Sequence, residues 1–359
     1  MKVLLVFGGA GSEHDVSLLG ARNVVAALSK TGHEIVPAYI TQSGAWSVGA
    51  PELMDIDGLR RAILGDHLTG STEKLAVQKA APIGSTATPS DLSAHKFAGA
   101  EVIFPLIHGR GGEDGAIAAL GQLLNIPVIG CDVRASQIAW DKDLCKQIVA
   151  AAGVPVVPWR TFHRHAKIPS FAKLTAELGS KILFVKPARE GSSVGVSRAA
   201  SAAEFSAAVE KAFTYDDKIL VEKAISGREL ECAVLGNTPD VTATDIGEIK
   251  PPAGDFYSYD EKYSTDSRTG LDIPAQNLDP LVRAQIQDYS RRAFIAIGGR
   301  GLARVDFFLS DSGEIYLNEI NTMPGFTNIS MYPKLWEQMG LSQIELIERL
   351  IELAIADQK

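Results

Sequence analysis

The sequence predicts an α/β domain followed by two α+β units, and three observations lead to this fold class. The first 140 residues alternate apolar, strand-like segments with helix-like segments, an order typical of a parallel sheet. After residue 140 the segments read as strands and a helix, and then as strand, helix and hairpin. The length of 359 residues fits two to three domains of roughly 100–200 residues each. We therefore expect domains at 1–140, 141–227 and 228–359.

Four apolar segments of the first domain read as buried parallel strands. They are KVLLVF, EIVPAYI, EVIFPLI and IPVIG, which are almost continuously apolar, as strands buried on both faces are. Residues 59–98 interrupt this alternation and are rich in Gly, Ser, Thr, Ala and Pro. We expect them to form a surface insertion.

The two later units are predicted from the same kind of pattern. In the second unit, VPVVPWRTF, KILFVKPA and KILVEKAI read as strands, and SAAEFSAAVEKAF reads as a helix. The third unit starts with the strand ELECAVLG and continues through a polar loop over 251–273. A helix over 280–297, a hairpin over 303–321 and an amphipathic helix over 342–356 complete it.

Composition and charge argue against several classes of function. The net charge is −8 without a long basic run, so we expect neither nucleic acid nor a membrane surface as a partner. The apolar run 3–6 is too short for a signal peptide or a membrane span. Three scattered cysteines show neither metal spacing nor a disulfide framework. We therefore expect a cytoplasmic protein.

The C-terminal hairpin is the most informative segment. If its SDSG turn connects the strands through an even number of residues, alternation groups four polar side chains on one face, namely Arg304, Asp306, Glu319 and Asn321. The opposite face would then be core, formed by Val305, Phe307, Leu309, Tyr316 and Ile320. Carboxylate and amide oxygens suit Mg²⁺ when phosphate supplies further ligands. The alternative is a solvated polar face with an ion pair.

Two other segments favour an anionic ligand such as a nucleotide. In VKPAREGSSVGVS, Lys186 ends an apolar strand, and the loop 191–195 can present backbone N–H groups to phosphate oxygens. In ILVEKAISGRELE, Glu222 ends a strand whose backbone can read a base, and Glu229 can accept ribose hydroxyls. A flexible loop and an ordinary strand end are the alternatives. Lys142 in WDKDLCK reads equally well as a surface lysine.

Two glycine-rich loops each connect a strand to a helix. FGGAGSEHDVS departs from the dinucleotide fingerprint, because His14 takes the place of the third glycine. Its carboxylates, Glu13 and Asp15, would repel a pyrophosphate. HGRGGEDG carries His108 and four glycines, which allow close approach of the backbone; a structural histidine is the alternative there. Neither a nucleophile triad nor a zinc or haem spacing is evident.

These motifs together resemble the D-alanine–D-alanine ligases, members of the ATP-grasp group. The resemblance covers nearly the whole chain and is weakest over 59–98. It rests on GGAGSEHDVSL, HGRGGEDG, WDKDLCK, VKPAREGSSVGVS, EKAISGRELE, YDEKYS, ARVDFFL and NEINTMPGFTNISMYP. It implies three domains, of which the last two sandwich ATP. It also implies two steps: ATP phosphorylates the carboxylate of one D-alanine, and the amine of a second then displaces phosphate.

The resemblance also implies ligand contacts for individual residues. ATP would be bound by Lys142, Lys186, Ser193, Glu222, Lys223, Ala224, Ile225, Glu229, Phe256, Lys262 and Asn318. Two Mg²⁺ ions, with Mn²⁺ as an alternative, would be held by Asp306, Glu319 and Asn321. The amino acids would contact Glu13, Val16, His108, Arg304, Gly325, Ser330 and Met331.

Further roles follow from the same resemblance. Glu13 would bind the ammonium group of the first D-alanine, which explains a carboxylate in the first glycine-rich loop. Arg304 and the backbone of Gly325 would stabilise an oxyanion. Tyr263 lies in the loop that would close over the site and exclude water, and Ser192 would link its hydroxyl to Glu13. A homodimer and a role in peptidoglycan precursor synthesis are also implied.

Other functions remain as alternatives. A related ligase would join D-alanine to D-lactate or D-serine; Tyr263 argues against D-lactate, because ester-forming relatives resemble this sequence with another residue there. A carboxylate ligase for a different substrate would not be expected to carry the Glu13 loop. A non-catalytic ATP-binding protein would lack the catalytic charges, yet all are present: Lys186, Arg304, Asp306 and Glu319.

Overall fold

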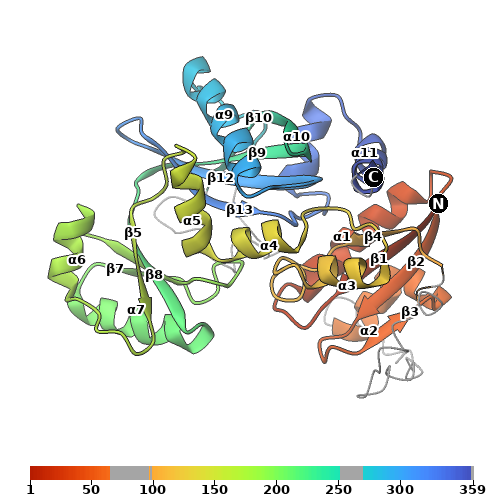
Figure 1. Cartoon of the computed structure of the whole chain (residues 1–359), viewed down its shortest axis with the longest axis horizontal. Helices are drawn as coiled ribbons and strands as arrows, with labels where there is room; N and C mark the ends of the chain where they lie inside the picture. The colour runs from red at the N-terminus through yellow and green to blue at the C-terminus, as the bar shows by residue number, and fades with distance from the viewer. Residues whose placement is uncertain (65–96, 98, 251–269, 357–359) are drawn as a thin grey trace. The chain divides into compact units, whose positions relative to one another are not determined.

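The structure is a computed structural model that describes residues 1–64, 97, 99–250 and 270–356 (Figure 1). These residues form two compact units. Unit 1 comprises Met1–Val133, Arg300–Leu302 and Met323–Lys359, and unit 2 comprises Arg134–Gly299 and Ala303–Thr322. The C-terminal segment therefore returns to the N-terminal unit, which the sequence pattern did not indicate. The division into three domains at 140 and 227 stays a prediction.

Unit 1 is built on a sheet with the strand order β3-β2-β1-β4. The central strand β1 (Lys2–Gly8) pairs in parallel with β2 (Glu34–Ile40) and with β4 (Val102–Pro105). The short edge strand β3 (Trp46–Val48) pairs with β2 in the antiparallel sense. Strand β1 is buried over nearly its whole length, so the predicted parallel sheet of continuously apolar strands is confirmed at its centre.

The segment IPVIG was wrongly predicted to be a strand. It forms an isolated parallel bridge between Val128 and Ile103. Ile103 donates to Pro127 O, and Ile129 donates to Ile103 O. Because proline has no backbone N–H, it cannot donate to a ladder. The apolar run therefore adds core side chains next to β4 without extending the sheet.

Helices of unit 1 pack on this sheet and on one another. Helix α1 contacts β1, α2 and α11, and α11 also contacts α10 and β4. Residues 59–64, predicted to begin the insertion, belong to α2, and 65–96 lie outside the described residues. The helices are α1 (His14–Leu28), η1 (Pro51–Met54), α2 (Ile56–Leu64), α3 (Ala116–Leu124), α10 (Met331–Gln338) and α11 (Gln343–Ala356).

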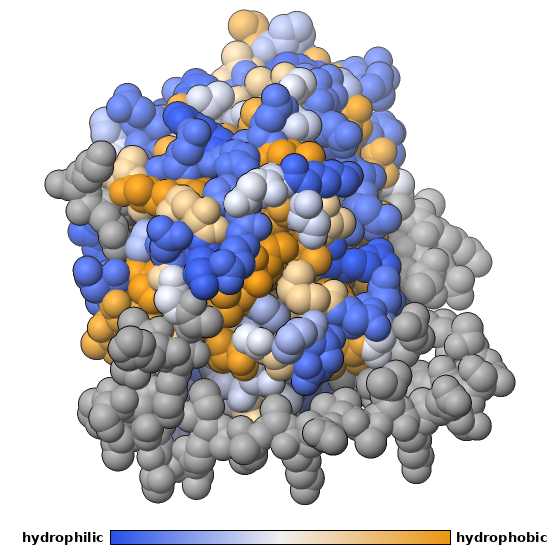
Figure 2. Space-filling view, turned by 90° about the vertical axis from the view of Figure 1, so that its right-hand side faces the viewer, coloured by the Kyte–Doolittle hydropathy of each residue, from blue (hydrophilic) through white to orange (hydrophobic). Residues whose placement is uncertain are grey.

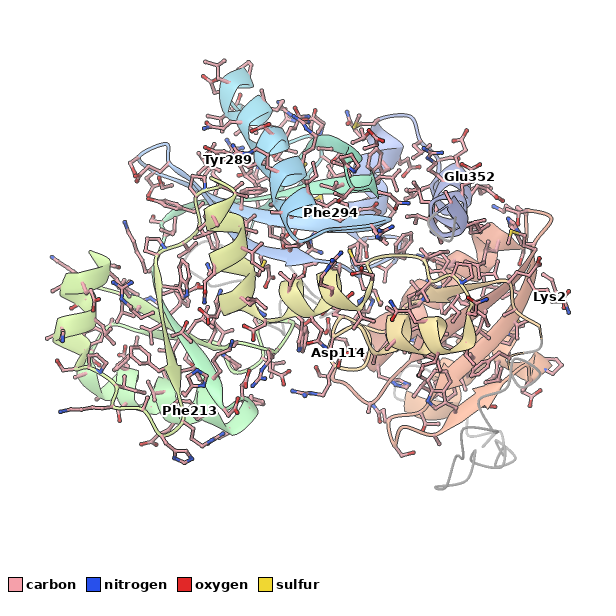
Figure 3. The ribbon with its side chains drawn as sticks, viewed as in Figure 1. Lys2, Asp114, Phe213, Tyr289, Phe294 and Glu352 are labelled. Atoms are coloured by element: carbon pink, nitrogen blue, oxygen red, sulfur yellow. The ribbon has the colours of Figure 1, made fainter. Side chains whose placement is uncertain are left out.

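One antiparallel sheet of unit 2 has the strand order β5-β8-β6-β7. Helices α6 (Phe171–Leu178) and α7 (Ala202–Tyr215) bury their apolar faces in its core, where Phe213 lies (Figure 3). Ser170 and Ser201 cap the two helices through their hydroxyl groups. The strands are β5 (Trp159–His163), β6 (Leu183–Pro187), β7 (Ser197–Ala199) and β8 (Lys218–Lys223).

The second sheet of unit 2 has the strand order β11-β10-β9-β12-β13. Helix α9 (Pro280–Ala296) packs on β9 and β10 and buries Phe294 (Figure 3). The end of the predicted loop 251–273 was wrong, because β11 pairs with β10; residues 251–269 lie outside the described residues. The strands are β9 (Gly227–Asn237), β10 (Asp240–Lys250), β11 (Gly270–Asp272), β12 (Leu302–Ser310) and β13 (Ile315–Asn321).

On the face drawn in Figure 2, hydrophobic residues gather toward the middle, and hydrophilic residues lie above them and to the right. Among the described residues, no helix is both long and apolar enough to span a bilayer. Two further helices of unit 2, α4 (Val133–Trp140) and α5 (Lys142–Ala151), precede its sheets. Helix α5 contacts both α9 and β13.

Candidate active site

The hairpin of β12 and β13 brings the predicted polar face together. Arg304 lies opposite Asn321, and Asp306 lies opposite Glu319. Directly opposed residues of an antiparallel pair have Cβ atoms about 4.5–5.5 Å apart. The hairpin alone therefore positions one guanidinium, two carboxylates and one amide close together.

The register of the hairpin differs from the predicted one near the turn. Leu309 pairs with Ile315, so an odd number of residues connects the strands there, and a bulge at Asn318 shifts the register back. The two deviations cancel at the polar face. They do not cancel at Tyr316, which pairs with Phe308 and was wrongly assigned to the core.

Arg304 is held by two carboxylates. Its Nε and Nη2 donate to Asp306 at 2.8 and 2.7 Å, and its Nε lies 3.2 Å from Glu231 Oε2. Burial alone would lower the pKa of the guanidinium, but Asp306 and Glu231 raise it well above its usual value. Arg304 therefore stays cationic and fixed in orientation, which suits a preorganised donor to developing negative charge.

The donor set on this face fits a hard divalent cation. Asp306 and Glu319 provide carboxylate oxygens, and Asn321, whose Nδ2 donates to Asp306 at 2.9 Å, can offer its amide oxygen. Mg²⁺ commonly binds through one or two carboxylates together with substrate phosphates and water. Among the described residues, no cluster of three or more His, Cys, Asp or Glu that could hold a metal ion is found.

Two buried lysines share one carboxylate in the same unit. Glu222 on β8 lies 2.8 Å from Lys186 Nζ and 3.0 Å from Lys146 Nζ. Burial would raise the pKa of Glu222, but the two ammonium groups lower it overall. Lys146 was missed by the sequence analysis, because a lysine four residues after Lys142 on a helix reads as a surface residue.

Neighbouring side chains connect this triad to the hairpin. Lys186 Nζ also donates to Asn318 Oδ1 at 3.4 Å, and Asn318 sits at the bulge of β13. Lys142 Nζ donates to Glu190 O at 2.5 Å and lies 3.8 Å from Glu319 Oε2. The structure thus brings the predicted lysines and the predicted acidic face of unit 2 into one neighbourhood.

The loop after β6 has the backbone of an anion-binding turn. Ser192 and Ser193 adopt positive φ angles of 49° and 62°, a conformation that is uncommon for residues other than glycine. Val194 donates to Gly191 O and Val196 donates to Ser193 O, at 3.0 and 3.2 Å. Left-handed turns of this kind can direct successive N–H groups toward one concave side.

The strand end proposed to read a base is partly engaged in backbone hydrogen bonds. Lys223 donates to Pro158 O at 3.0 Å, and Ala224 donates to Ile182 O at 3.2 Å. Ile225 follows as a half-buried residue, and Glu229 lies on β9 opposite Ile249. The backbone N–H groups of Lys223 and Ala224 therefore already donate to other backbone groups of the protein.

In unit 1 the two glycine-rich loops meet at Glu13. Glu13 is the N-cap residue of α1 and is almost fully buried. A Cβ atom at Gly109 would lie 3.3 Å from Glu13 Oε2, and Gly109 has a φ of 70°. The second loop therefore passes close to this carboxylate at a residue without a side chain. Val16, one turn later, is half-buried.

The residues after Glu13 have structural roles. His14 Nδ1 lies 2.6 Å from Gly9 O and its Nε2 lies 3.2 Å from the Tyr39 hydroxyl. Asp15 pairs with Arg60 of α2, at 2.5 and 2.9 Å. Through these contacts, His14 and Asp15 shape the loop around Glu13.

The C-terminal segment adds to unit 1 three residues that were predicted to contact the amino acids, namely Gly325, Ser330 and Met331. His108 Nδ1 lies 3.1 Å from Met323 O. Ser330 is the N-cap residue of α10, which begins at Met331, and its Oγ accepts from Thr327 N at 3.0 Å. A Cβ atom at Gly325 would lie 2.7 Å from Ser330 Oγ. Phe256, Lys262 and Tyr263 lie outside the described residues.

The fold, in which two sheets of unit 2 bring buried lysines close to the acidic hairpin face, is that of an ATP-grasp protein. Residues 2–131 match the family described as "D-ala D-ala ligase N-terminus", and residues 148–352 match "D-ala D-ala ligase C-terminus". The chain belongs to the D-alanine–D-alanine ligase family.

Individual relatives are similar along their full length. A D-alanine–D-alanine ligase of Shouchella clausii is 42% identical, covering 99% of this chain and 94% of its own. D-alanine–D-alanine ligase A of Escherichia coli K12 is 40% identical, covering 99% and 96%. A ligase structure from Coxiella burnetii matches with a TM-score of 0.80 and 34% identity, covering 100% and 96%. The VanG D-Ala:D-Ser ligase of Enterococcus faecalis matches with 0.81 and 33%, covering 98% and 99%.

Proposed function

We propose that this protein joins two molecules of D-alanine to D-alanyl-D-alanine and converts ATP to ADP and phosphate. The observation that carries the proposal is the hairpin face on which Arg304 and Asp306 oppose Asn321 and Glu319. A fixed guanidinium beside hard oxygen ligands suits the formation and breakdown of an acyl phosphate. Full-length similarity to D-alanine–D-alanine ligases supports D-alanine as the substrate.

In the first step, a carboxylate oxygen of one D-alanine attacks the γ-phosphorus of ATP. The bond from that phosphorus to the bridging oxygen breaks, and ADP leaves. Lys142, Lys186 and the loop 191–195 balance the phosphate charge, and Glu13 binds the ammonium group of the amino acid. Asp306, Glu319 and Asn321 would hold two Mg²⁺ ions, with Mn²⁺ as an alternative, and these ions would neutralise charge on the phosphates.

In the second step, the neutral amine of another D-alanine attacks the carbonyl carbon of the acyl phosphate. A C–N bond forms, and the C–O bond to phosphate breaks after a tetrahedral intermediate. The ammonium group first loses one proton to solvent, and the attacking nitrogen then loses a second proton, which leaves with the phosphate as hydrogen phosphate. Arg304 and the Gly325 amide donate to the oxyanion, while Ser330 and Met331 bind the second carboxylate. The loop that contains Lys262 and Tyr263 excludes water from the intermediate.

The biological setting follows from the product. D-alanyl-D-alanine is a building block of peptidoglycan precursors, and this role together with the use of ATP supports a cytoplasmic enzyme. We propose that it acts as a homodimer, as members of the family usually do. Similarity over 99% of the chain to D-alanine–D-alanine ligases supports this setting.

A substrate panel tests the proposal. The purified protein is incubated with ATP, Mg²⁺ and D-alanine, alone or with D-serine, D-lactate or L-alanine, and phosphate and products are measured by mass spectrometry. D-alanyl-D-alanine should dominate in every mixture. The similarity to a D-Ala:D-Ser ligase structure makes D-serine the informative competitor. A dominant mixed product would replace the assigned second substrate, and a lack of phosphate release would refute the ligase assignment.

A further inference from the structure

A third buried charge stands beside the pair formed by Lys186 and Glu222. Lys146 Nζ lies 3.0 Å from Glu222 Oε1, whereas Lys186 Nζ lies 2.8 Å from Oε2. From this geometry we propose that Lys146 is a positioning residue that fixes the Glu222 carboxylate and thereby keeps Lys186 available to the nucleotide. The proposal rests on the proposed function, because it takes Lys186 and Glu222 as ATP-binding residues.

Burial separates Lys146 from direct ligand contact. Its side chain is 1% exposed, compared with 8% for Lys186 and 5% for Glu222. Within the described part of the chain, its Nζ also lies 3.4 Å from Val157 O and 5.8 Å from the ring centre of Trp159. Neutral contacts of this kind do not compensate for the desolvation of a full charge. Burial lowers the pKa of Lys146, and Glu222 is the main partner that opposes this shift and favours the charged form.

Because Glu222 contacts two ammonium groups, the loss of one of them would change the position of the other. A carboxylate with one ammonium on each oxygen cannot rotate without losing a contact. If Lys146 were neutral, both oxygens of Glu222 would compete for Lys186, because a lone buried carboxylate attracts the remaining cation strongly. Lys186 would then move from Asn318, now 3.4 Å away, toward the carboxylate, and its remaining N–H groups would point away from a ligand.

Helix α5 holds Lys146 in a fixed position relative to Glu222. Lys146 lies four residues after Lys142, so both project from one face of α5. The start of the helix is capped by Asp141, and Asp143 accepts from Trp159 Nε1 at 2.9 Å and from Thr161 Oγ1 at 2.7 Å. Both acceptor contacts tie α5 to β5, the strand that pairs with β8. The distance from Lys146 to Glu222 is thus set by the sheet.

The test compares Lys146→Met with Lys173→Met in the full-length protein. Lys173 is an exposed lysine of α6 in the same unit, so its replacement removes an equal charge from the surface. Affinity for a non-hydrolysable ATP analogue is measured by calorimetry, and KM for ATP and for D-alanine by dipeptide formation. For K146M we expect Kd and KM for ATP to rise about tenfold or more, as for a lost charged hydrogen bond, with less than a twofold change in KM for D-alanine. K173M should leave all three values unchanged.

Three results distinguish positioning from a purely structural role. A lower melting temperature for K146M with unchanged ATP affinity at 25 °C would overturn the proposal. The double variant K146M/E222Q should bind ATP no worse than E222Q alone, and additive losses would also overturn it. If K146M does not fold, K146R tests the charge: it should keep ATP affinity within about threefold of wild type, and a folded K146R that loses affinity tenfold refutes the idea.

Failure of the proposed function gives a different outcome. A wild-type protein that binds the ATP analogue but forms no D-alanyl-D-alanine would refute the ligase assignment. The calorimetric comparison of K146M with K173M would still decide whether Lys146 positions the nucleotide-binding pair.

Discussion

Asp306 accepts both hydrogen bonds that Arg304 donates from Nε and Nη2, at 2.8 and 2.7 Å. The same carboxylate accepts from Asn321. Arg304, assigned to the oxyanion, and two of the residues assigned to the cations, Asp306 and Asn321, therefore form one hydrogen-bonded group. Replacing Asp306 would disturb Arg304 as well as the metal ligands. Glu319, which lies across the strand from Asp306, gives a cleaner test of the metal assignment.

We predict that Glu319→Ala abolishes turnover while the fold is retained. The change removes a carboxylate that would neutralise the charge of metal and phosphate in the transition state, and it leaves the Arg304–Asp306 hydrogen bonds in place. Dipeptide formation across a Mg²⁺ titration, together with circular dichroism, measures the two effects.

The matched control is Glu314→Gln, at the exposed turn of the same hairpin. This variant should keep full activity, since it alters a carboxylate on the same element away from the polar face. Near-normal activity of E319A at saturating Mg²⁺ would contradict the metal assignment.

We predict that Glu13→Gln weakens the binding of the first D-alanine more than the binding of ATP. Glutamine keeps the shape of the side chain beside Gly109 but removes the charge that faces an ammonium group. A charge-assisted hydrogen bond contributes roughly 1.5–3 kcal/mol, which is about 10- to 150-fold in affinity. Initial rates over a wide range of D-alanine concentration should separate the two half-saturation values.

The control for this prediction is Glu52→Gln, an exposed glutamate of η1 in the same unit. It should leave both half-saturation values as in the wild type. If E13Q weakened both D-alanine sites equally, the loop would act as a general structural element and not as the ammonium site.

The hairpin illustrates how far sequence patterns reach. Alternation correctly predicted that Arg304 and Asp306 share a face. The prediction that Glu319 and Asn321 lie on the same face was also correct, but only because the odd loop and the bulge cancel. Apolar patterns cannot locate a bulge, since the extra residue, Asn318, is polar like its neighbours on that face. The assignment of Tyr316 to the core failed for this reason.

Long-range placement could not be read from local patterns. The helix 342–356 was predicted as amphipathic, but its partner, α1, lies more than 300 residues away in the chain. Lys146 was missed for a related reason, because its burial depends on Glu222 arriving from a strand that begins at Lys218. Periodicity identifies the faces of elements, whereas the pairing of faces depends on the tertiary structure.

We predict that Tyr263→Phe, within the segment outside the described residues, lowers peptide formation several-fold to about a hundredfold without abolishing it. A single hydroxyl contributes roughly 0.5–1.5 kcal/mol, and more if a partner is left unpaired. A less polar site should also accept D-lactate better, because a hydroxyl nucleophile carries no charge to desolvate. The ratio of ester to dipeptide with both nucleophiles present is the measurement. An unchanged ratio would limit the role of Tyr263 to exclusion of water.

We predict that Gly112→Ala destabilises unit 1 far more than Gly32→Ala. A Cβ atom at Gly112 would lie 1.8 Å from Ile107 O, whereas no atom lies within 4 Å of a Cβ at Gly32. Overpacking of this kind costs about 1–3 kcal/mol or more, because a backbone carbonyl cannot move aside as a flexible side chain can. Thermal unfolding of both variants measures the difference. Equal melting temperatures would show that the loop 108–115 yields easily.

We predict that the ionisation of Asp216, which contacts Arg189 in the loop after β6, makes the stability of the protein depend on pH. Asp216 accepts from Arg189 N at 2.8 Å, from its side chain at 2.5 and 3.1 Å, and from Lys218 N at 3.1 Å. Burial would raise the pKa of Asp216, but these donors lower it from the usual 3.8 to about 2. A carboxyl with a lowered folded-state pKa stabilises the fold above its unfolded pKa. That stability disappears as the pH falls from about 5 toward 2.

We therefore expect Asp216→Asn to lower the free energy of unfolding at pH 7 by on the order of 2 kcal/mol, which is the size that the shift implies. The difference from wild type should shrink toward pH 2, because folded Asp216 becomes protonated as the pH approaches its pKa. Urea unfolding at pH 7, 4 and 2.5 measures this difference in the free energy of unfolding. The control, Asp217→Asn, removes a carboxylate that also contacts Arg189 but is 70% exposed, so solvent screens it and its effect should be small. A gap between D216N and wild type that stays constant with pH would mean that shape, and not the charge of Asp216, anchors the loop.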